Sequence, residues 1–93
     1  MRVEFDIGLN SIEKVKTFAY VAMGAIHSEI YVISGKHKQY ICDGKSILGL
    51  FSLNLLSPMR CVITGNSETE IDSFYNNLNM YGIVLQNNRV LQN

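Results

Sequence analysis

The start of the chain changes from an alternating to a helical hydrophobic pattern. Apolar and polar residues alternate in "RVEFDI", which predicts a strand over residues 2–7 with Val3, Phe5 and Ile7 on one face. Beyond it, apolar residues recur every three or four positions, which predicts a helix with one buried stripe. That stripe consists of Val15, Phe18, Ala19, Ala22, Ala25 and Ile26.

The ends of this first helix are predicted from its flanking residues. Asn10 stands where an N-cap is needed, and Glu13 three residues later would complete a capping box, in which each side chain satisfies a backbone donor. We expect the helix to end near His27.

Three further runs predict strands. They are "EIYVIS" over 29–34, "YICD" over 40–43 and "MRCVITG" over 59–65. The first two would form a hairpin with a basic tip at 36–39, "KHKQ".

A second long helix is predicted after residue 66. Ser67 followed by Glu70 is another capping box, and Gly82 would end the helix. Its apolar stripe is Ile71, Phe74, Tyr75 and Leu78. Glu68, Glu70 and Asp72 would complement the helix dipole, as a solvated and stabilising face.

Together with a short helix discussed below, the predicted order is β-α-β-β-(short α)-β-α. This order favours an α+β fold, an open-faced sandwich with a mostly antiparallel four-stranded sheet covered on one face by helices. The domain would span residues 1–80, and residues 81–93 would form an extension. Asn87 and Asn88 between two apolar runs suggest a small hairpin or an added strand. An exposed edge would favour pairing with a second chain, so a homodimer is left open.

Composition excludes several classes of function. The 93 residues carry eight basic and eight acidic side chains, so no net field attracts nucleic acid or an anionic membrane. No run approaches the roughly 20 apolar residues that cross a bilayer, and the first ten residues lack a signal-peptide core. We therefore expect a cytoplasmic protein.

Cysteine and histidine provide little chemistry. Cys42 and Cys61 lie in predicted strands and are expected to be small core residues. His27 and His37 lack a cysteine or carboxylate at ligand spacing, so we expect neither a metal nor a cofactor. Apart from Ser46 the chain has no nucleophile with a neighbouring base, so an enzyme is not predicted.

The segment "DGKSILGLFSLNL", Asp43 to Leu55, combines a Gly-Lys-Ser with an apolar run too short to span a membrane. A short helix beginning at Ser46, with an exposed apolar face, would explain both features. The Gly-Lys-Ser is not a nucleotide-binding P-loop, because Gln39 stands where the loop requires its upstream glycine.

This segment resembles the central signature of HPr, the histidine-containing phosphocarrier protein of the bacterial sugar phosphotransferase system. The match rests on Lys45-Ser46-Ile47, Gly49 and Ser52-Leu53. The predicted element order is similar to that of the family over residues 1–80. The resemblance implies the open-faced fold and a role linked to phosphoenolpyruvate-dependent sugar transport.

The family's phosphate-carrying motif is degenerate in this chain. It is Gly-(Leu or Ile)-His-Ala-Arg-Pro, and residues 8–13 here are Gly-Leu-Asn-Ser-Ile-Glu. Asn10 replaces the histidine, and a side-chain amide is no phosphoryl acceptor. Ile12 replaces the arginine, and Glu13 would repel phosphate. We expect phosphocarrier chemistry to be absent.

Ser46 is the family feature that remains. In Gram-positive members the matching serine is phosphorylated by a dedicated kinase, and the product binds a catabolite-control transcription factor. The resemblance thus makes Ser46 a candidate regulatory phosphoserine, with Lys45 near the added phosphate. The alternative is that Ser46 is only an N-cap.

The apolar residues after Ser46 form a candidate partner-binding surface. Ile47, Leu50 and Phe51 share one side of the predicted helix, and Leu48 lies around from it. They cannot all be buried, so with Lys45 the residues Ile47, Leu48 and Phe51 would contact a protein partner. That partner would be a phosphotransferase component, a serine kinase or the transcription factor. Alternatively, the tail or a second copy covers this surface.

The sequence therefore favours a regulatory or adaptor protein that acts through the Ser46 helix. Two alternatives remain open. One is an active phosphocarrier with phosphate on His27 or His37. The other is a small-molecule-binding regulatory domain of the amino-acid-sensing kind, which has a related layout.

Overall fold

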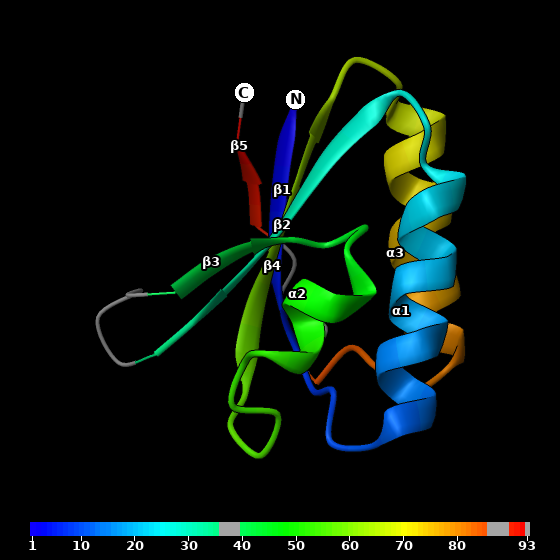
Figure 1. Ribbon diagram of the computed structural model, residues 1–93. Helices are drawn as coiled ribbons and strands as arrows, with labels where there is room; N and C mark the ends of the chain where they lie inside the picture. Colours follow the sequence, from blue (N-terminus) through cyan, green and yellow to red (C-terminus); the bar gives the residue numbers. More distant parts are fainter. Residues whose placement is uncertain (36–39, 86–89, 93) are drawn as a thin grey trace.

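The computed structural model describes residues 1–35, 40–85 and 90–92 (Figure 1). The elements follow one another in the order β-α-β-β-α-β-α-β. The strands are β1 (Arg2–Ile7), β2 (Ser28–Ser34), β3 (Tyr40–Asp43), β4 (Met59–Gly65) and β5 (Val90–Gln92). The helices are α1 (Ile12–Gly24), α2 (Ile47–Phe51) and α3 (Glu68–Met80).

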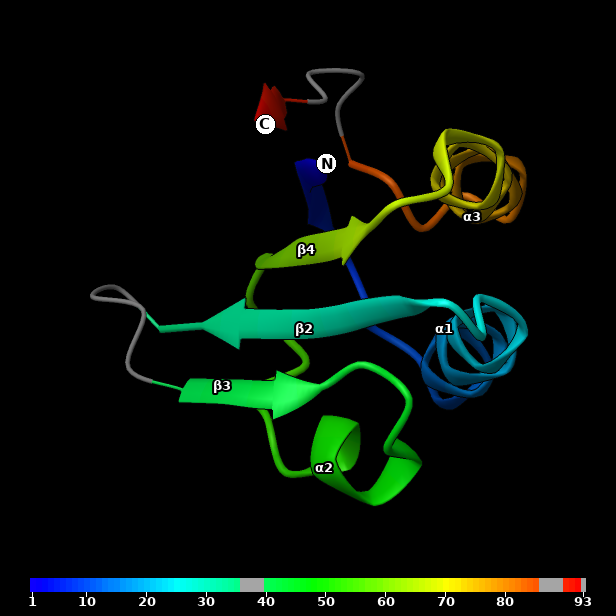
Figure 2. The same ribbon diagram turned by 90° about the horizontal axis from the view of Figure 1, so that it is seen from above.

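The strands form one antiparallel sheet in the order β3-β2-β4-β1-β5. The helices lie on one side of this sheet and leave its other face uncovered (Figures 1 and 2). The predicted α+β class and open antiparallel sheet are confirmed. The sheet also contains a fifth strand, β5, which lies in the tail, where an added strand was one of the two predicted alternatives.

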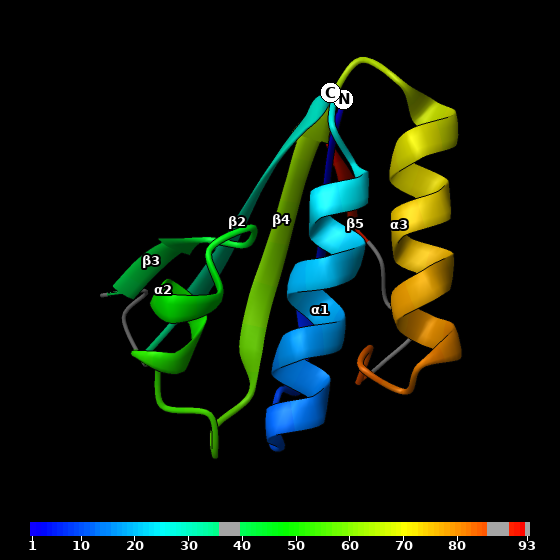
Figure 3. The ribbon, with the colours of Figure 1, turned by 45° about the vertical axis from the view of Figure 1, so that its right-hand side comes forward.

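The core lies between the sheet and the two long helices, which run side by side (Figure 3). Val3, Phe5 and Ile7 are buried, as the alternation of the first strand predicts. Phe5 meets the ring of Tyr75 edge-on with centroids 4.9 Å apart. Phe74 joins this cluster and also contacts Phe18 of α1, so aromatic rings connect the sheet to both helices.

The predicted boundaries of α1 are wrong at both ends. Ser11, not Asn10, is the N-cap, because its hydroxyl accepts a hydrogen bond from the backbone N–H of Lys14 at 3.1 Å. The predicted capping box of Asn10 with Glu13 therefore does not exist. The helix ends at Gly24 instead of near His27, and Ile26, predicted in the buried stripe, is 71% exposed.

The predicted start and end of α3 are confirmed, with one correction. Ser67 accepts a hydrogen bond from the backbone N–H of Glu70, and Gly82 has the positive φ of 73° that suits a residue just past a helix end. The Glu70 carboxylate does not complete the capping box: one oxygen accepts from the His27 backbone N–H at 3.0 Å and the Ser28 hydroxyl at 2.7 Å. Glu70 is half-buried, so it is not part of a solvated face.

The segment after α3 packs onto the same domain. Ile83 is buried in the common core, and its carbonyl accepts a hydrogen bond from the Gly8 backbone N–H. Farther on, β5 pairs with β1, opposite Arg2–Glu4. The predicted hairpin turn at Asn87-Asn88 and the basic tip at 36–39 lie outside the described residues.

Candidate functional site

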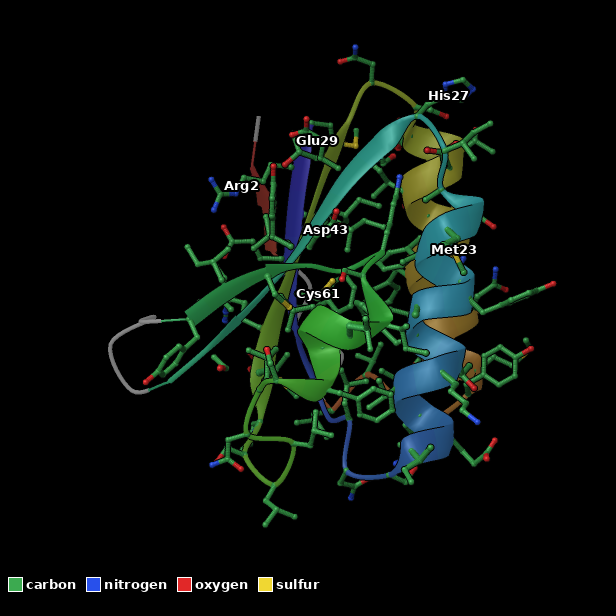
Figure 4. All side chains as sticks on the ribbon, viewed as in Figure 1. Arg2, Met23, His27, Glu29, Asp43 and Cys61 are labelled. Carbon is green, nitrogen blue, oxygen red and sulfur yellow. The ribbon has the colours of Figure 1, made fainter. Side chains whose placement is uncertain are left out.

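The start of α1 carries no imidazole in the described part of the chain. Asn10 is exposed and lies just before the N-cap Ser11. His27 lies beyond the opposite end of α1 (Figure 4). At 1.5 Å per residue, the 13 residues of α1 place it roughly 20 Å from Asn10. His37 lies outside the described residues. An amide therefore occupies the position that the resemblance assigns to the phosphoryl-accepting histidine.

The connection from β3 to α2 is fixed by Asp43 and Gly44. One carboxylate oxygen of Asp43 accepts a hydrogen bond from the Lys45 backbone N–H at 2.9 Å, which closes a local turn. Gly44 is buried and donates its N–H to the Ile30 carbonyl at 2.8 Å. A Cβ at Gly44 would lie 2.4 Å from Cγ2 of Ile30 and 3.1 Å from the Phe18 ring. Close packing alone therefore requires glycine here.

Lys45 has a structural environment that the sequence did not indicate. Its ammonium donates to the carbonyl oxygens of Ala25 and Ser28, each at 2.9 Å. Both carbonyls lie just beyond the C-terminal end of α1, where the helix dipole favours a cation. Sequence reasoning placed Lys45 beside Ser46 as a partner-binding group. In the structure its charged end is instead engaged inside the molecule.

Ser46 is the N-cap of α2. Its hydroxyl accepts a hydrogen bond from the Gly49 backbone N–H at 3.2 Å, as the sequence predicted for this residue. The other end of this single turn is closed by Ser52, whose hydroxyl donates to the Gly49 carbonyl at 2.6 Å. Two serine side chains thus stabilise a helix too short to be stable alone. The Ser46 side chain is exposed.

The apolar residues of α2 divide into one anchor and three surface residues. Leu50 is completely buried in the core. Leu48 is 81% exposed, and Ile47 and Phe51 are each 38% exposed. We call Ile47, Leu48 and Phe51 the α2 surface. They are adjacent on one turn of helix, and burying Leu50 fixes their orientation.

The described part of the tail does not cover the α2 surface. β5 lies at the β1 edge of the sheet, whereas α2 lies beside β3, at the opposite edge (Figure 2). The alternative that the tail buries these residues is therefore wrong for this part of the tail.

The two thiols are in environments that suppress their reactivity. Cys61 is completely buried, as predicted for a core residue, and this burial raises the pKa of its thiol. Cys42 is only half-buried and packs against the core. Burial, and then the charge of Asp43, raise the pKa of the Cys42 thiol. Both sulfurs stay protonated at neutral pH and are poor nucleophiles.

Within residues 1–35, 40–85 and 90–92, no three histidine, cysteine or acidic side chains gather as metal ligands. No helix in this part of the chain is long and apolar enough to span a membrane. The other residues of this site have structural roles within the protein. The exposed apolar side chains of α2 have no such role in the described part of the chain.

Neither a protein-family model nor a curated protein sequence matches this chain.

Proposed function

We propose that this chain is an HPr-like regulatory or adaptor protein related to the sugar phosphotransferase system, which binds protein partners through the α2 surface and does not carry phosphate. The observation that carries the proposal is the exposure of Ile47, Leu48 and Phe51 on a short helix held by Ser46 and Leu50. A rigidly presented apolar cluster loses little conformational entropy on binding, which favours a role in recognition.

The HPr-like assignment is supported by the fold and by the segment that contains the helix. The order β1-α1-β2-β3-α2-β4-α3 agrees with the order expected from the resemblance over residues 1–80. The segment Asp43 to Leu55 encloses α2, so the part of the sequence most similar to HPr is the part that presents the proposed contact surface.

The absence of phosphate transfer is supported by Asn10. Its amide replaces the acceptor nitrogen, and His27 lies beyond the far end of α1. Incubation with phosphoenolpyruvate and the first enzyme of the phosphotransferase system tests this part. We expect no acid-labile phosphate on the protein. Label on His27 or His37 would establish a working carrier and contradict the proposal.

Phosphorylation of Ser46 would be the regulatory input to this surface. The hydroxyl is exposed at the start of α2, where backbone N–H groups of the first turn favour a phosphate. Because the Lys45 ammonium is engaged by Ala25 and Ser28, we expect those N–H groups to be the main contact of the phosphate. Incubation with the serine kinase and ATP, followed by mass measurement of wild type and Ser46→Ala, tests this step.

The binding surface itself is tested with purified partners. We expect the catabolite-control transcription factor or a phosphotransferase enzyme to bind the wild-type protein, and Leu48→Ser and Phe51→Ala to weaken that binding at least tenfold, as central apolar contacts do. Met80→Ser is the matched control, because Met80 is an exposed apolar residue of α3, away from α2. Equal affinity of all variants would remove the α2 surface from the proposal.

A further inference from the structure

The uncovered face of the sheet carries a second apolar cluster. In the pairing register, Tyr31 lies opposite Val62, and Ile33 lies opposite Ile41, with Tyr31 and Ile33 two residues apart on β2. These four side chains therefore share the face away from the helices. We call Tyr31, Ile33, Ile41 and Val62 the sheet-face cluster. Ile41 is 64% exposed and Tyr31 is 40% exposed.

This cluster surrounds a shallow depression. A hollow of about 350 Å³ is lined by its four residues together with Arg2 and Thr64. Val62 forms the floor, because it is only 4% exposed although no helix covers it. A hollow with an apolar floor and mainly apolar walls on an open sheet is a typical contact surface for a partner element.

The charged residues on this face are distributed unevenly. On the β1 side, Glu4 pairs with Arg2 at 3.1 Å and with Arg60 at 3.3 Å. Arg60 also contacts Asp6 at 3.4 Å, so charges on that side are balanced in pairs.

On the β2 and β3 side, the carboxylates are not paired with basic side chains in the described part of the chain. Glu29 accepts a hydrogen bond from the Tyr31 hydroxyl, and Asp43 accepts one from a backbone N–H. Neither forms an ion pair within residues 1–35, 40–85 and 90–92. Both flank Tyr31: Glu29 lies two residues before it on β2, and Asp43 lies directly opposite it on β3. Among the described residues, the apolar cluster therefore has an acidic rim at one end, made of two carboxylates that form no ion pair.

We propose that this face binds a basic amphipathic helix of a partner protein. The apolar stripe of such a helix would cover the sheet-face cluster, as helices cover the opposite face of the same sheet. Its Lys or Arg residues would meet Glu29 and Asp43. An anionic partner would be repelled by the same carboxylates. This surface lies on the opposite side of the sheet from the α2 surface, so the two can be tested separately (Figure 2).

The probe is a capped synthetic helix of about 14 residues, with leucines on one face and lysines on the other. Its counterpart has glutamate in place of every lysine. We expect the basic peptide to bind with micromolar affinity and to shift the amide NMR signals of Tyr31, Ile33, Ile41 and Val62. The acidic peptide should bind at least tenfold more weakly.

Two variants test the two halves of the surface. Ile41→Ser should abolish the shifts, and because Ile41 is exposed on an edge strand this variant should remain folded. Glu29→Gln combined with Asp43→Asn should weaken binding about threefold or more at low salt and flatten its salt dependence. Glu13→Gln, which removes an exposed charge on α1, and Leu48→Ser on α2 should bind like wild type.

Three results would overturn the inference. The first is a set of shifts at α2 or between α1 and α3 in place of the sheet face. The second is equal affinity for the basic and acidic peptides. The third is concentration-dependent change of the same four signals without peptide, because a second copy of the chain would then be the occupant. If Leu48→Ser loses the protein partner of the α2 surface but still binds this peptide, the result concerns only the α2 surface. The inference about the sheet face then stands.

Discussion

Two neighbouring segments, Asp43–Ser46 and Ile47–Phe51, differ in how their side chains are used. In the first segment every residue supports the fold. Asp43 closes a turn and Gly44 packs on Ile30, while Lys45 binds carbonyls beyond α1 and Ser46 caps α2. In the second segment, Leu50 is buried, and Ile47, Leu48 and Phe51 remain on the surface.

Within one motif, the first segment therefore maintains the fold, and the surface residues of the second are available for recognition. A Gly-Lys-Ser signature can be required by packing and hydrogen bonding alone, so its presence is weak evidence of phosphate chemistry. Exposed apolar residues cost solubility and contribute little to stability, so the following segment is the one that points to a function. Substitutions in the first segment and at Leu50 should affect folding, whereas substitutions of Ile47, Leu48 or Phe51 should affect binding.

Among substitutions in the first segment, Gly44→Ala should have the largest effect on stability. The new methyl group would lie 2.4 Å from Ile30, which is buried in the core, so we expect a loss of about 3 kcal/mol in the free energy of unfolding. Urea denaturation measures it. Gly24→Ala is the control, because nothing lies within 4 Å of that position and alanine favours the helix. Equal stability of the two variants would contradict the close packing at Gly44.

Lys45→Met should cost about 2 kcal/mol, because it leaves the carbonyls of Ala25 and Ser28 without their charged donor. The same denaturation experiment on Lys16→Met, which removes an exposed lysine of α1, should give almost no change. If both lysine variants behave alike, Lys45 is a surface residue, available to a partner or a phosphate as its place in the sequence first suggested.

Ser46→Ala should cost about 1 kcal/mol through loss of the N-cap. Ser67→Ala, which removes the N-cap of α3, should cost a similar amount, and the exposed Ser73→Ala should cost nothing. A Ser46→Ala protein as stable as wild type would show that the hydroxyl is free for another role.

Leu48→Ser should change stability least, by less than about 0.5 kcal/mol, because its side chain is exposed. Leu50→Ala, two residues later, should cost about 3 kcal/mol because that side chain is buried. Thermal melts of the pair sharpen the comparison inside α2 itself. A large loss in Leu48→Ser would mean that this residue supports the fold.

Much of the fold could be predicted because local signals agreed with the tertiary structure. Strand β4 was predicted with its observed bounds, since Pro58 precedes an apolar run that ends in a Gly-Asn-Ser turn. The start of α1 was missed by one residue because Asn10 and Ser11 are both good N-caps, and the backbone conformation decides between them.

The errors at the site concern contacts between residues distant in the sequence. Nothing near Lys45 indicates that its ammonium binds carbonyls 17 and 20 residues earlier. The same holds for Glu70, whose carboxylate binds the start of β2 in place of its own helix. The sequence assigned Leu48 to the contact surface and left Leu50 out of it. It did not separate buried Leu50 from Ile47 and Phe51, which it placed on the same side, because a five-residue helix shows too few turns to define its buried side.

The pairing of β5 with β1 has a practical consequence for how this protein can be handled. Arg2 lies opposite Gln92, so the two ends of the described chain emerge together at one margin of the sheet, and α2 lies beside the other margin. A tether attached at either end would hold the molecule on a sensor surface with α2 directed outward, and the same geometry makes a circularly permuted chain feasible.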